Sequence, residues 1–450
     1  MSLLTPMMRS SPLTAWFSDA QRVQGMLDFE AALIRAQAAC GIVPQAAVAP
    51  VVNACRHSLI DFSALGEAAA DAGNLAIPLV RQLTACVKAA DPQAARYVHW
   101  GATSQDAIDS GLILQLRGAL AETDSLLQRL MAEFARQAQR HQHTVMPGRT
   151  WMQHALPVTF GLKLAGTLDT LLRWRQRLRE MRARVLVLQF GGAAGTLDSL
   201  KGHGPEVAGR LATELGLALP DTPWHSQRDR LLEVGAWYAG VCGTLGKFAN
   251  DFSLLMQTEV AEVAEPVAEG RGGSSTMPHK RNPVGCAAIL TAAQRTPGLV
   301  ACLYAGQVQQ HERALGGWQA EWETLPELIT LVGGALEQSV ELARDMQVFP
   351  QKMRADLDIT HGLIMAEAVT LALAEFIGKA DAHHRVEALC RQAIDQSRPL
   401  LALLESDHQV SQHLSVARLT QLLDPTTATG SAEIFVRQVV ARYKEQHDEP

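Results

Sequence analysis

The segment 272–283, GGSSTMPHKRNP, gathers the side chains of this sequence that are best suited to chemistry. Its glycines and prolines disfavour a regular element, so a loop is expected. Its hydroxyls and its lysine are too polar for a core and predict contact with a ligand. Lys280 and Asn282 could stabilise negative charge that forms on a substrate, and Ser274 or its neighbour Ser275 could carry a proton. No G-x-S-x-G elbow surrounds the serines, which argues against a hydrolase nucleophile.

A second cluster, RYVHWGATSQD at residues 96–106, supplies residues that start helices. Thr103 and Ser104 suit N-cap positions, and Asp106 suits a first helical turn. The free N–H groups of such a helix start attract an anion. A plain capped helix explains the same residues, and the residues alone leave both interpretations open.

Two further clusters lie near the ends of expected helices. In residues 147–157, PGRTWMQHALP, two prolines bracket a group of polar side chains. This segment forms either a ligand site or a plain turn between two helices. The polar residues are Arg149, Thr150, Gln153 and His154. In residues 189–200, QFGGAAGTLDSL, the glycines predict close backbone approach or a tight turn. A nucleotide site is not indicated, because no credible strand precedes them.

The elements that must hold these clusters are predicted to be helices. Alanine, leucine, glutamine, glutamate and arginine dominate, and strand-like alternation is scarce. A helical stripe of apolar residues runs through Leu112, Leu116, Leu120, Leu127, Leu130 and Phe134. Long proline-free stretches allow helices well above the usual mean of about 11–12 residues, which predicts an elongated bundle. Segment 231–260 is apolar almost all round, which suggests burial against other subunits.

Composition excludes several classes of protein. The 450 residues carry a formal net charge of −6, so a nucleic-acid partner is not expected. The seven cysteines show no C-x-x-C spacing, which argues against a disulfide framework or a zinc site and favours a reducing compartment. We expect no secretory signal, because the N-terminal residues contain no long apolar region. We expect no membrane-spanning helix, because no stretch of about 18 uncharged apolar residues is evident. A cytoplasmic enzyme without a metal fits these features.

The four clusters together resemble the fumarase/aspartase superfamily. GSSTMPHKRNP is similar to its most specific signature, G-S-S-x-M-P-x-K-x-N, while TSQD at 103–106, RTWMQ at 149–153 and GAAGT at 192–196 match other regions in order. The resemblance covers essentially the whole chain. It implies an all-α subunit of three domains, expected here at 1–107, 108–350 and 351–450. It further implies a central five-helix bundle, a homotetramer with a twenty-helix core, and active sites assembled from three subunits.

The resemblance also implies a chemistry, which is removal of a proton next to a carboxylate and elimination of a β group. On this basis Ser274 is the base, and Lys280, Asn282 and loop N–H groups hold the enediolate-like charge. The predicted substrate contacts are His99, Thr103, Ser104, Arg149, Thr150, Trp151 and Gln153. For Arg149 a fork that binds a carboxylate and a structural salt bridge both remain open. No organic cofactor or metal is implied.

The sequence departs from the superfamily pattern where a leaving group would be protonated. Trp151 occupies the position where related lyases have a histidine. In several of those lyases this histidine pairs with a glutamate, and Ala287 occupies the position of that glutamate. Expelling an amine or water benefits from a proton donor, whereas a carboxylate of pKa about 4 leaves without one. The departure favours the lactone-forming cycloisomerases of the superfamily, which add one carboxylate of a small conjugated tricarboxylate across a double bond.

Two alternatives remain. Segment 310–328 resembles a part of the adenylosuccinate lyases, although Trp322 replaces an arginine that would help to hold a nucleotide. A carbon–nitrogen lyase would need another acid, and His154 is the candidate, although a structural role is favoured for it. A crystallin-like structural protein is the non-enzyme alternative, and the intact set of Ser274, Lys280 and Asn282 argues against it.

Overall fold

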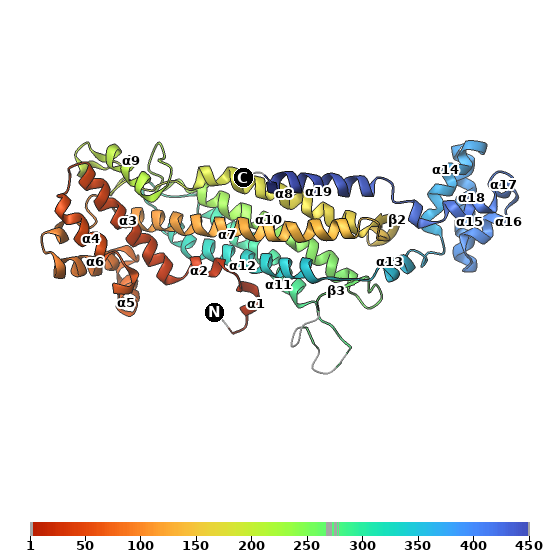
Figure 1. Ribbon diagram of the computed structural model, residues 1–450, viewed down its shortest axis with the longest axis horizontal. Coiled ribbons are helices and arrows are strands. Elements are labelled where there is room, and N and C mark those ends of the chain that lie inside the picture. Colours follow the sequence, from red (N-terminus) through yellow and green to blue (C-terminus); the bar gives the residue numbers. More distant parts are fainter. Residues whose placement is uncertain (1–2, 267–271, 274–276, 278, 449–450) are drawn as a thin grey trace. The chain divides into compact units, whose positions relative to one another are not determined.

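The computed structural model describes residues 3–266, 272–273, 277 and 279–448, and these residues are mostly helical (Figure 1). The chain divides into two units. The first comprises Met1–Leu127, Arg173–Gly246 and Ala288–Glu337. The second comprises Gln128–Leu172, Lys247–Ala287 and Gln338–Pro450. The mostly helical fold predicted from composition is confirmed, while the three domains stay a prediction.

The unit boundaries fall within five long helices. These are α7 (Ser104–Arg140), α8 (Phe160–Val185), α10 (Asp229–Leu255), α11 (Val284–Ala305) and α12 (Gly317–Asp345). The first, α7, has no internal proline, and its predicted stripe is buried at Leu116, Leu120 and Leu127. Helix α11 is long and apolar enough to cross a membrane by length and composition, a test that core helices of soluble proteins also pass.

The remaining elements of the first unit are shorter than these five helices. They are α1 (Pro6–Arg9), α2 (Leu13–Trp16), α3 (Asp19–Ala39), η1 (Gln45–Ala47), α4 (Val48–Ala54), η2 (His57–Leu59), α5 (Phe62–Ala72), α6 (Ala76–Ala90), η3 (Ala94–Tyr97), η4 (Asp198–Leu200) and α9 (Gly204–Leu215). Ser18 caps α3 by accepting the N–H of Gln21, and Asp61 caps α5 in the same manner. The Ser18 cap fixes the start of α3, the helix that carries Glu30, the partner of His99.

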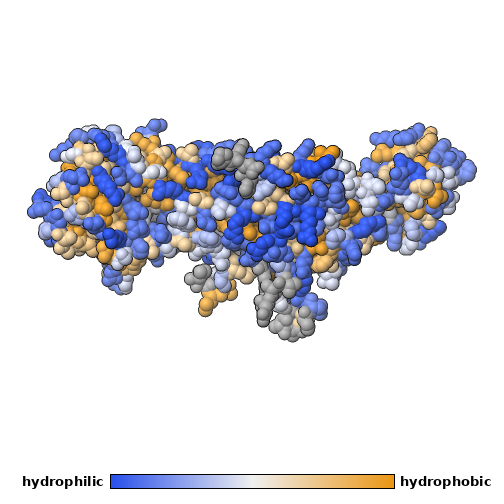
Figure 2. Space-filling model, viewed as in Figure 1, coloured by the Kyte–Doolittle hydropathy of each residue, from blue (hydrophilic) through white to orange (hydrophobic). Residues whose placement is uncertain are grey.

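Helix α10 accounts for much of segment 231–260. Val234, Tyr238, Val241 and Leu245 are fully buried within one chain, and the Tyr238 hydroxyl lies 2.7 Å from Thr123 Oγ1. Packing inside a single subunit therefore explains much of the broad apolar surface that suggested contact between subunits. Figure 2 shows hydrophilic and apolar residues interspersed on the face that it draws.

The second unit contains the strands and the C-terminal helices. Its elements are β1 (Val145–Thr150), β2 (Gln153–Thr159), β3 (Val263–Ala264), β4 (Gln347–Val348), α13 (Pro350–Asp356), η5 (Leu363–Met365), α14 (Ala366–Ile377), α15 (Lys379–Gln396), α16 (Leu400–Ser406), α17 (His408–Ser411), α18 (Val416–Leu422), η6 (Pro425–Thr427) and α19 (Ala432–Asp448). Val369, Leu373, Val386 and Leu404 belong to one core formed by α14–α18.

Strands β1 and β2 form an antiparallel hairpin that the sequence analysis did not predict. Thr150 pairs with Gln153 across a two-residue turn made by Trp151 and Met152, whose φ angles are +52° and +64°. Such a turn normally carries Asn-Gly, so its sequence signal is absent here. Pro147 and Pro157, which suggested a break, face one another within the ladder of a two-stranded ribbon, where both strands are edges.

Candidate active site

The loop at residues 272–283, called the glycine-rich loop below, is closed by a hydrogen bond between its two ends. The Asn282 N–H donates to the Gly272 carbonyl at 2.8 Å. Gly272 has a φ of +66°, and a Cβ there would lie 2.7 Å from the Asn282 carbonyl oxygen, so this approach requires glycine. Lys280 is exposed and Asn282 is half-buried. Ser274 and Ser275 lie outside the described residues.

Glu265 connects this loop to the helix that follows it. Its carboxylate accepts the N–H groups of Gly285 at 3.0 Å and Cys286 at 2.8 Å, in the first turn of α11. Its backbone carbonyl accepts a 2.6 Å bond from the Arg281 guanidinium, which also donates to Gln347. A buried acid at a helix start satisfies N–H groups that have no partner within the helix. Glu265 thus fixes the chain between Lys280 and Asn282 and again shortly after Asn282.

The β1–β2 hairpin presents a second set of predicted contacts. Thr150, Trp151 and Gln153 are exposed at its tip, and 97% of the Trp151 surface is accessible. The Arg149 guanidinium donates to both oxygens of Glu262 at 2.8 and 3.0 Å. Of the two roles considered for Arg149, the structure therefore contains the structural ion pair.

His154 lies on β2 and is a poor proton donor. Burial lowers the pKa of His154, the nearby Arg149 lowers it further, and Asp356 opposes them. Its Nδ1 atom is buried without a hydrogen-bond partner among the described residues. A neutral imidazole with a buried nitrogen fits the structural role expected for His154.

In the first unit, the start of α7 forms an anion-attracting cluster. Arg313 donates to the Thr103 hydroxyl at 2.7 Å and to the Ser104 hydroxyl at 3.2 Å. No carboxylate among the described residues forms an ion pair with Arg313, so its charge remains available for an anionic ligand. The N–H groups at the helix start carry partial positive charge, which also favours an anion. This arrangement suits a substrate carboxylate.

His99 is close to this helix start along the chain. Its Nδ1 lies 2.5 Å from Glu30 Oε1, and the Glu30 side chain is only 2% exposed. Burial lowers the pKa of His99, but the Glu30 carboxylate, with a contribution from Asp106, outweighs burial and raises that pKa overall. His99 therefore favours the charged form, whose Nε2–H can donate to an anion.

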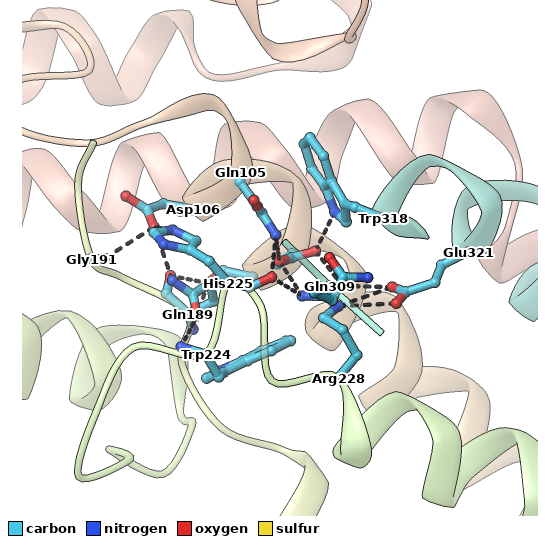
Figure 3. Close-up of polar contacts among 12 residues, drawn as sticks. Gln105, Asp106, Gln189, Gly191, Trp224, His225, Arg228, Gln309, Trp318 and Glu321 are labelled. Atoms are coloured by element: carbon cyan, nitrogen blue, oxygen red, sulfur yellow. Dashed lines mark hydrogen bonds and ion pairs between the residues drawn. The ribbon is translucent and has the colours of Figure 1, made fainter. Parts of the chain in front are cut away.

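Asp106 is the structural centre of this cluster (Figure 3). It is fully buried and accepts five hydrogen bonds: from the Thr103, Gly191 and Gly192 N–H groups, the Gln189 side chain and His225 Nε2, at 2.7 to 3.1 Å. A Cβ on Gly191 would lie 2.8 Å from Pro223, which confirms the predicted close backbone approach at residues 189–200.

A second buried network lies one turn further along α7 (Figure 3). Arg228 donates to both oxygens of Asp109 at 2.7 and 3.0 Å and also to Glu321. Trp318 Nε1 donates to Asp109 at 3.0 Å. Burial lowers the pKa of Arg228, but Asp109 and Glu321 raise it overall, while burial raises the pKa of Glu321. The network joins α7 to α12 through Arg228, which lies immediately before α10.

Comparisons with known proteins identify the family of this chain. Residues 7–298 match the family model described as lyase, and residues 362–439 match the model described as adenylosuccinate lyase C-terminus. The chain belongs to the fumarase/aspartase superfamily.

Relatives within the superfamily are similar over nearly their whole length. The chain is 57% identical over 441 residues to the 3-carboxy-cis,cis-muconate cycloisomerase of Pseudomonas aeruginosa, covering 98% of this chain and 96% of that one. It is 51% identical to the protein of that name from Bradyrhizobium diazoefficiens, covering 97% of each. The solved 3-carboxy-cis,cis-muconate lactonizing enzyme of Pseudomonas putida superposes with a TM-score of 0.94 at 50% identity, covering 98% of this chain and 99% of that one.

Sequence reasoning missed several residues that hold the predicted substrate contacts or lie near them. Arg313 lies inside the segment 310–328 that was compared with adenylosuccinate lyases, and its HER context was a usable signal. Asp106 was interpreted only as a first-turn acid. Glu262 and Arg228 gave no signal, since each meets its partner across more than 90 residues of sequence.

Proposed function

We propose that this chain is a 3-carboxy-cis,cis-muconate cycloisomerase, which interconverts that tricarboxylate and its carboxymuconolactone in aromatic catabolism. The observation that carries the proposal is the similarity over nearly the full length to proteins of that name, which reaches 57% identity with the Pseudomonas aeruginosa protein. A cytoplasmic location and a homotetramer belong to the same proposal.

The proposed reaction is an intramolecular addition. One substrate carboxylate attacks the conjugated double bond, and proximity is supplied by the substrate itself. Negative charge then develops on the conjugated carboxylate and is stabilised by Lys280, Asn282 and loop N–H groups. Ser274 delivers a proton to the α carbon and removes it in the reverse direction. No metal or organic cofactor takes part.

The remaining carboxylates need cationic and hydroxyl partners. Arg313, Thr103 and Ser104 supply them at the start of α7, where the guanidinium has no carboxylate partner among the described residues. Charged His99 adds a donor. A substrate with three carboxylates has one to spare for this positive cluster.

The hairpin supports a mechanism without a proton donor for the leaving group. Trp151 offers no proton that could assist a leaving carboxylate, and His154 favours its neutral form. These features disfavour the carbon–nitrogen lyase alternative, which requires an acid.

The exposed tip also supports a site shared between subunits. A tryptophan that is 97% exposed in one chain is unusual for a soluble protein and would be covered if the tip reached a neighbouring subunit. We propose that Thr150, Trp151 and Gln153 complete the site of another subunit.

Variants of Lys280 test the proposal. Lys280→Ala should reduce turnover of 3-carboxy-cis,cis-muconate by about 100- to 1,000-fold, the usual cost of losing one oxyanion partner. Mixing Lys280→Ala subunits with Thr150→Ala subunits should restore part of the activity, because some mixed sites contain neither substitution. Full activity of Lys280→Ala alone would contradict the assigned role.

A further inference from the structure

A pocket with mainly apolar walls lies between α3, α7 and α12, within the first unit. Its walls include Met26 from α3, Leu75 just before α6, Ile108 and Leu112 from α7, and Pro326 from α12. It encloses about 480 Å³, its open mouth included. That volume falls in the range of roughly 300–1,000 Å³ that is usual for small-molecule sites. Among the described residues, no predicted substrate contact lines this apolar pocket.

The mouth of the apolar pocket holds a cation without a counter-ion. Arg22 on α3 is half-buried and lines both the pocket and an adjoining groove bordered by Arg9 and Glu323. Arg9 is neutralised by Glu327 at 2.7 Å. The Arg22 side chain has no hydrogen bond or ion pair with any described residue, exposed Glu323 included. Its guanidinium fork is therefore available to a carboxylate that enters the mouth.

The acid in the pocket wall decides how many charges a ligand can carry. Both oxygens of Glu321 accept hydrogen bonds from Arg228, at 2.6 to 3.2 Å (Figure 3). Arg228 also serves Asp109, so one guanidinium faces two carboxylates. This wall stays negative and disfavours a second anionic group. A ligand would place one carboxylate at Arg22 and an uncharged body beside Glu321.

Trp322 adds a donor and an aromatic surface. It lines the pocket and the groove, as Arg22 does, and its Nε1 is buried without an acceptor among the described residues. A buried N–H without an acceptor costs stability, so a ligand oxygen that accepted from it would gain affinity. Because Nε1 is closed off from water, the indole has to turn slightly to make this bond. Its ring also favours a flat aromatic or unsaturated neighbour.

We propose that the apolar pocket binds a small, flat monocarboxylate with an aromatic or unsaturated body. Arg22 and Trp322 hold its carboxylate, and the apolar walls enclose the body. The pocket lies beside Ile108 to Gln115, which are roughly 6 to 17 Å beyond Ser104 along α7 at 1.5 Å per residue. A ligand here therefore occupies different space from an anion held by Ser104, and this inference goes beyond the proposed function.

Calorimetric titration of the purified wild-type protein tests the ligand class with three probes. Benzoate has both the charge and the aromatic body, benzamide lacks the charge, and acetate lacks the body. Benzoate should bind at least about tenfold more tightly than either of the others, because the charge-assisted hydrogen bond and the buried apolar area both contribute. No binding of benzoate, or equal affinity for all three, would overturn the proposal.

Variants test which residues hold the carboxylate. Arg22→Gln should weaken benzoate binding by about tenfold or more, and Trp322→Phe, which keeps a ring but loses the N–H, by about threefold to tenfold. Arg81→Gln is the control, since Arg81 is exposed on α6 and does not line the pocket; its affinity should equal that of wild type. A loss in Arg313→Gln with none in Arg22→Gln would place benzoate at the start of α7 and overturn the assignment.

Crystals grown with 4-bromobenzoate locate the ligand directly. The anomalous signal of bromine should lie against Met26 and Pro326 in wild type and be absent in Arg22→Gln. Bromine found only outside the apolar pocket would contradict the proposal. These measurements need no turnover, so they decide this site whether or not the proposed function holds. If a variant does not fold, the three probes and the bromine position in wild type still decide it.

Discussion

Two groups of buried carboxylates support the predicted substrate contacts, and they differ in the donors they receive. Beneath the start of α7, Asp106 accepts five hydrogen bonds, and Arg228 bonds both Asp109 and Glu321. Beneath the hairpin, Asp356 Oδ2 has no donor among the described residues. A carboxylate whose oxygens all accept hydrogen bonds is held in one geometry, whereas a buried oxygen without a donor costs stability. The first group is therefore a fixed support, whereas the second leaves one buried carboxylate oxygen unsatisfied.

The largest expected effect comes from breaking the fixed support at its cation. Arg228→Met leaves Asp109 and Glu321 buried without their partner, which should cost about 3–5 kcal/mol of unfolding free energy. Urea denaturation measures this loss. The matched control is Arg184→Met, since Arg184 pairs with Glu233 on the surface. An equal, small loss in both variants would show that the buried network is not a rigid support.

A smaller loss is expected at Asp106. Asp106→Asn keeps the shape but turns an amide toward N–H groups that now lack an acceptor, at a cost of about 1–3 kcal/mol. Because Asp106 holds the Thr103 N–H, KM for the substrate should rise as well. Steady-state kinetics with parallel urea denaturation separate the two effects. A stability loss with unchanged KM would mean that Asp106 supports the fold alone.

Arg313 tests whether the fixed support presents a cation to the substrate. Arg313→Gln removes the charge from a half-buried position and should raise KM by about tenfold or more, the usual worth of a charge-assisted hydrogen bond. Unfolding free energy should change little. Arg281→Gln, which loses bonds to Glu265 and Gln347 instead, is a useful comparison. Unchanged KM in Arg313→Gln would remove this residue from the site.

The smallest effect concerns His99, whose contribution to stability depends on pH. The pKa of His99 is raised by Glu30, so the stability given by this pair is present below the ordinary histidine pKa of about 6.5 and lost as pH rises through the folded value. Glu30→Gln should therefore destabilise the protein at mildly acidic pH and much less at alkaline pH. Urea denaturation at both pH values measures this difference, with exposed Asp28→Asn as control. A loss that does not vary with pH would contradict a charged His99.

Local chemistry made part of the fold predictable. The proline-free stretch before Pro147 and the apolar stripe through Leu116, Leu120 and Leu127 predicted α7, because helix periodicity is a local property. The glycines of residues 189–200 predicted close approach for the same reason. The hairpin was missed because its turn uses Trp151 and Met152 at positive φ, where the usual Asn-Gly signal is missing.

The charged networks could not be predicted from one sequence. Arg228 meets Asp109 across 119 residues and Glu321 across 93, and nothing local distinguishes it from a surface arginine. The same holds for Arg149 and Glu262, so a fork for substrate and a structural ion pair were equally compatible with the sequence. Tertiary packing alone decides which charges are buried together.

The most direct test of the account is an assay of the purified protein against a small panel of substrates. The account predicts that the ultraviolet absorbance of 3-carboxy-cis,cis-muconate disappears as the lactone forms, and that adenylosuccinate and related succinyl compounds release no fumarate. Release of fumarate from one of those compounds, together with no change in 3-carboxy-cis,cis-muconate, would contradict it.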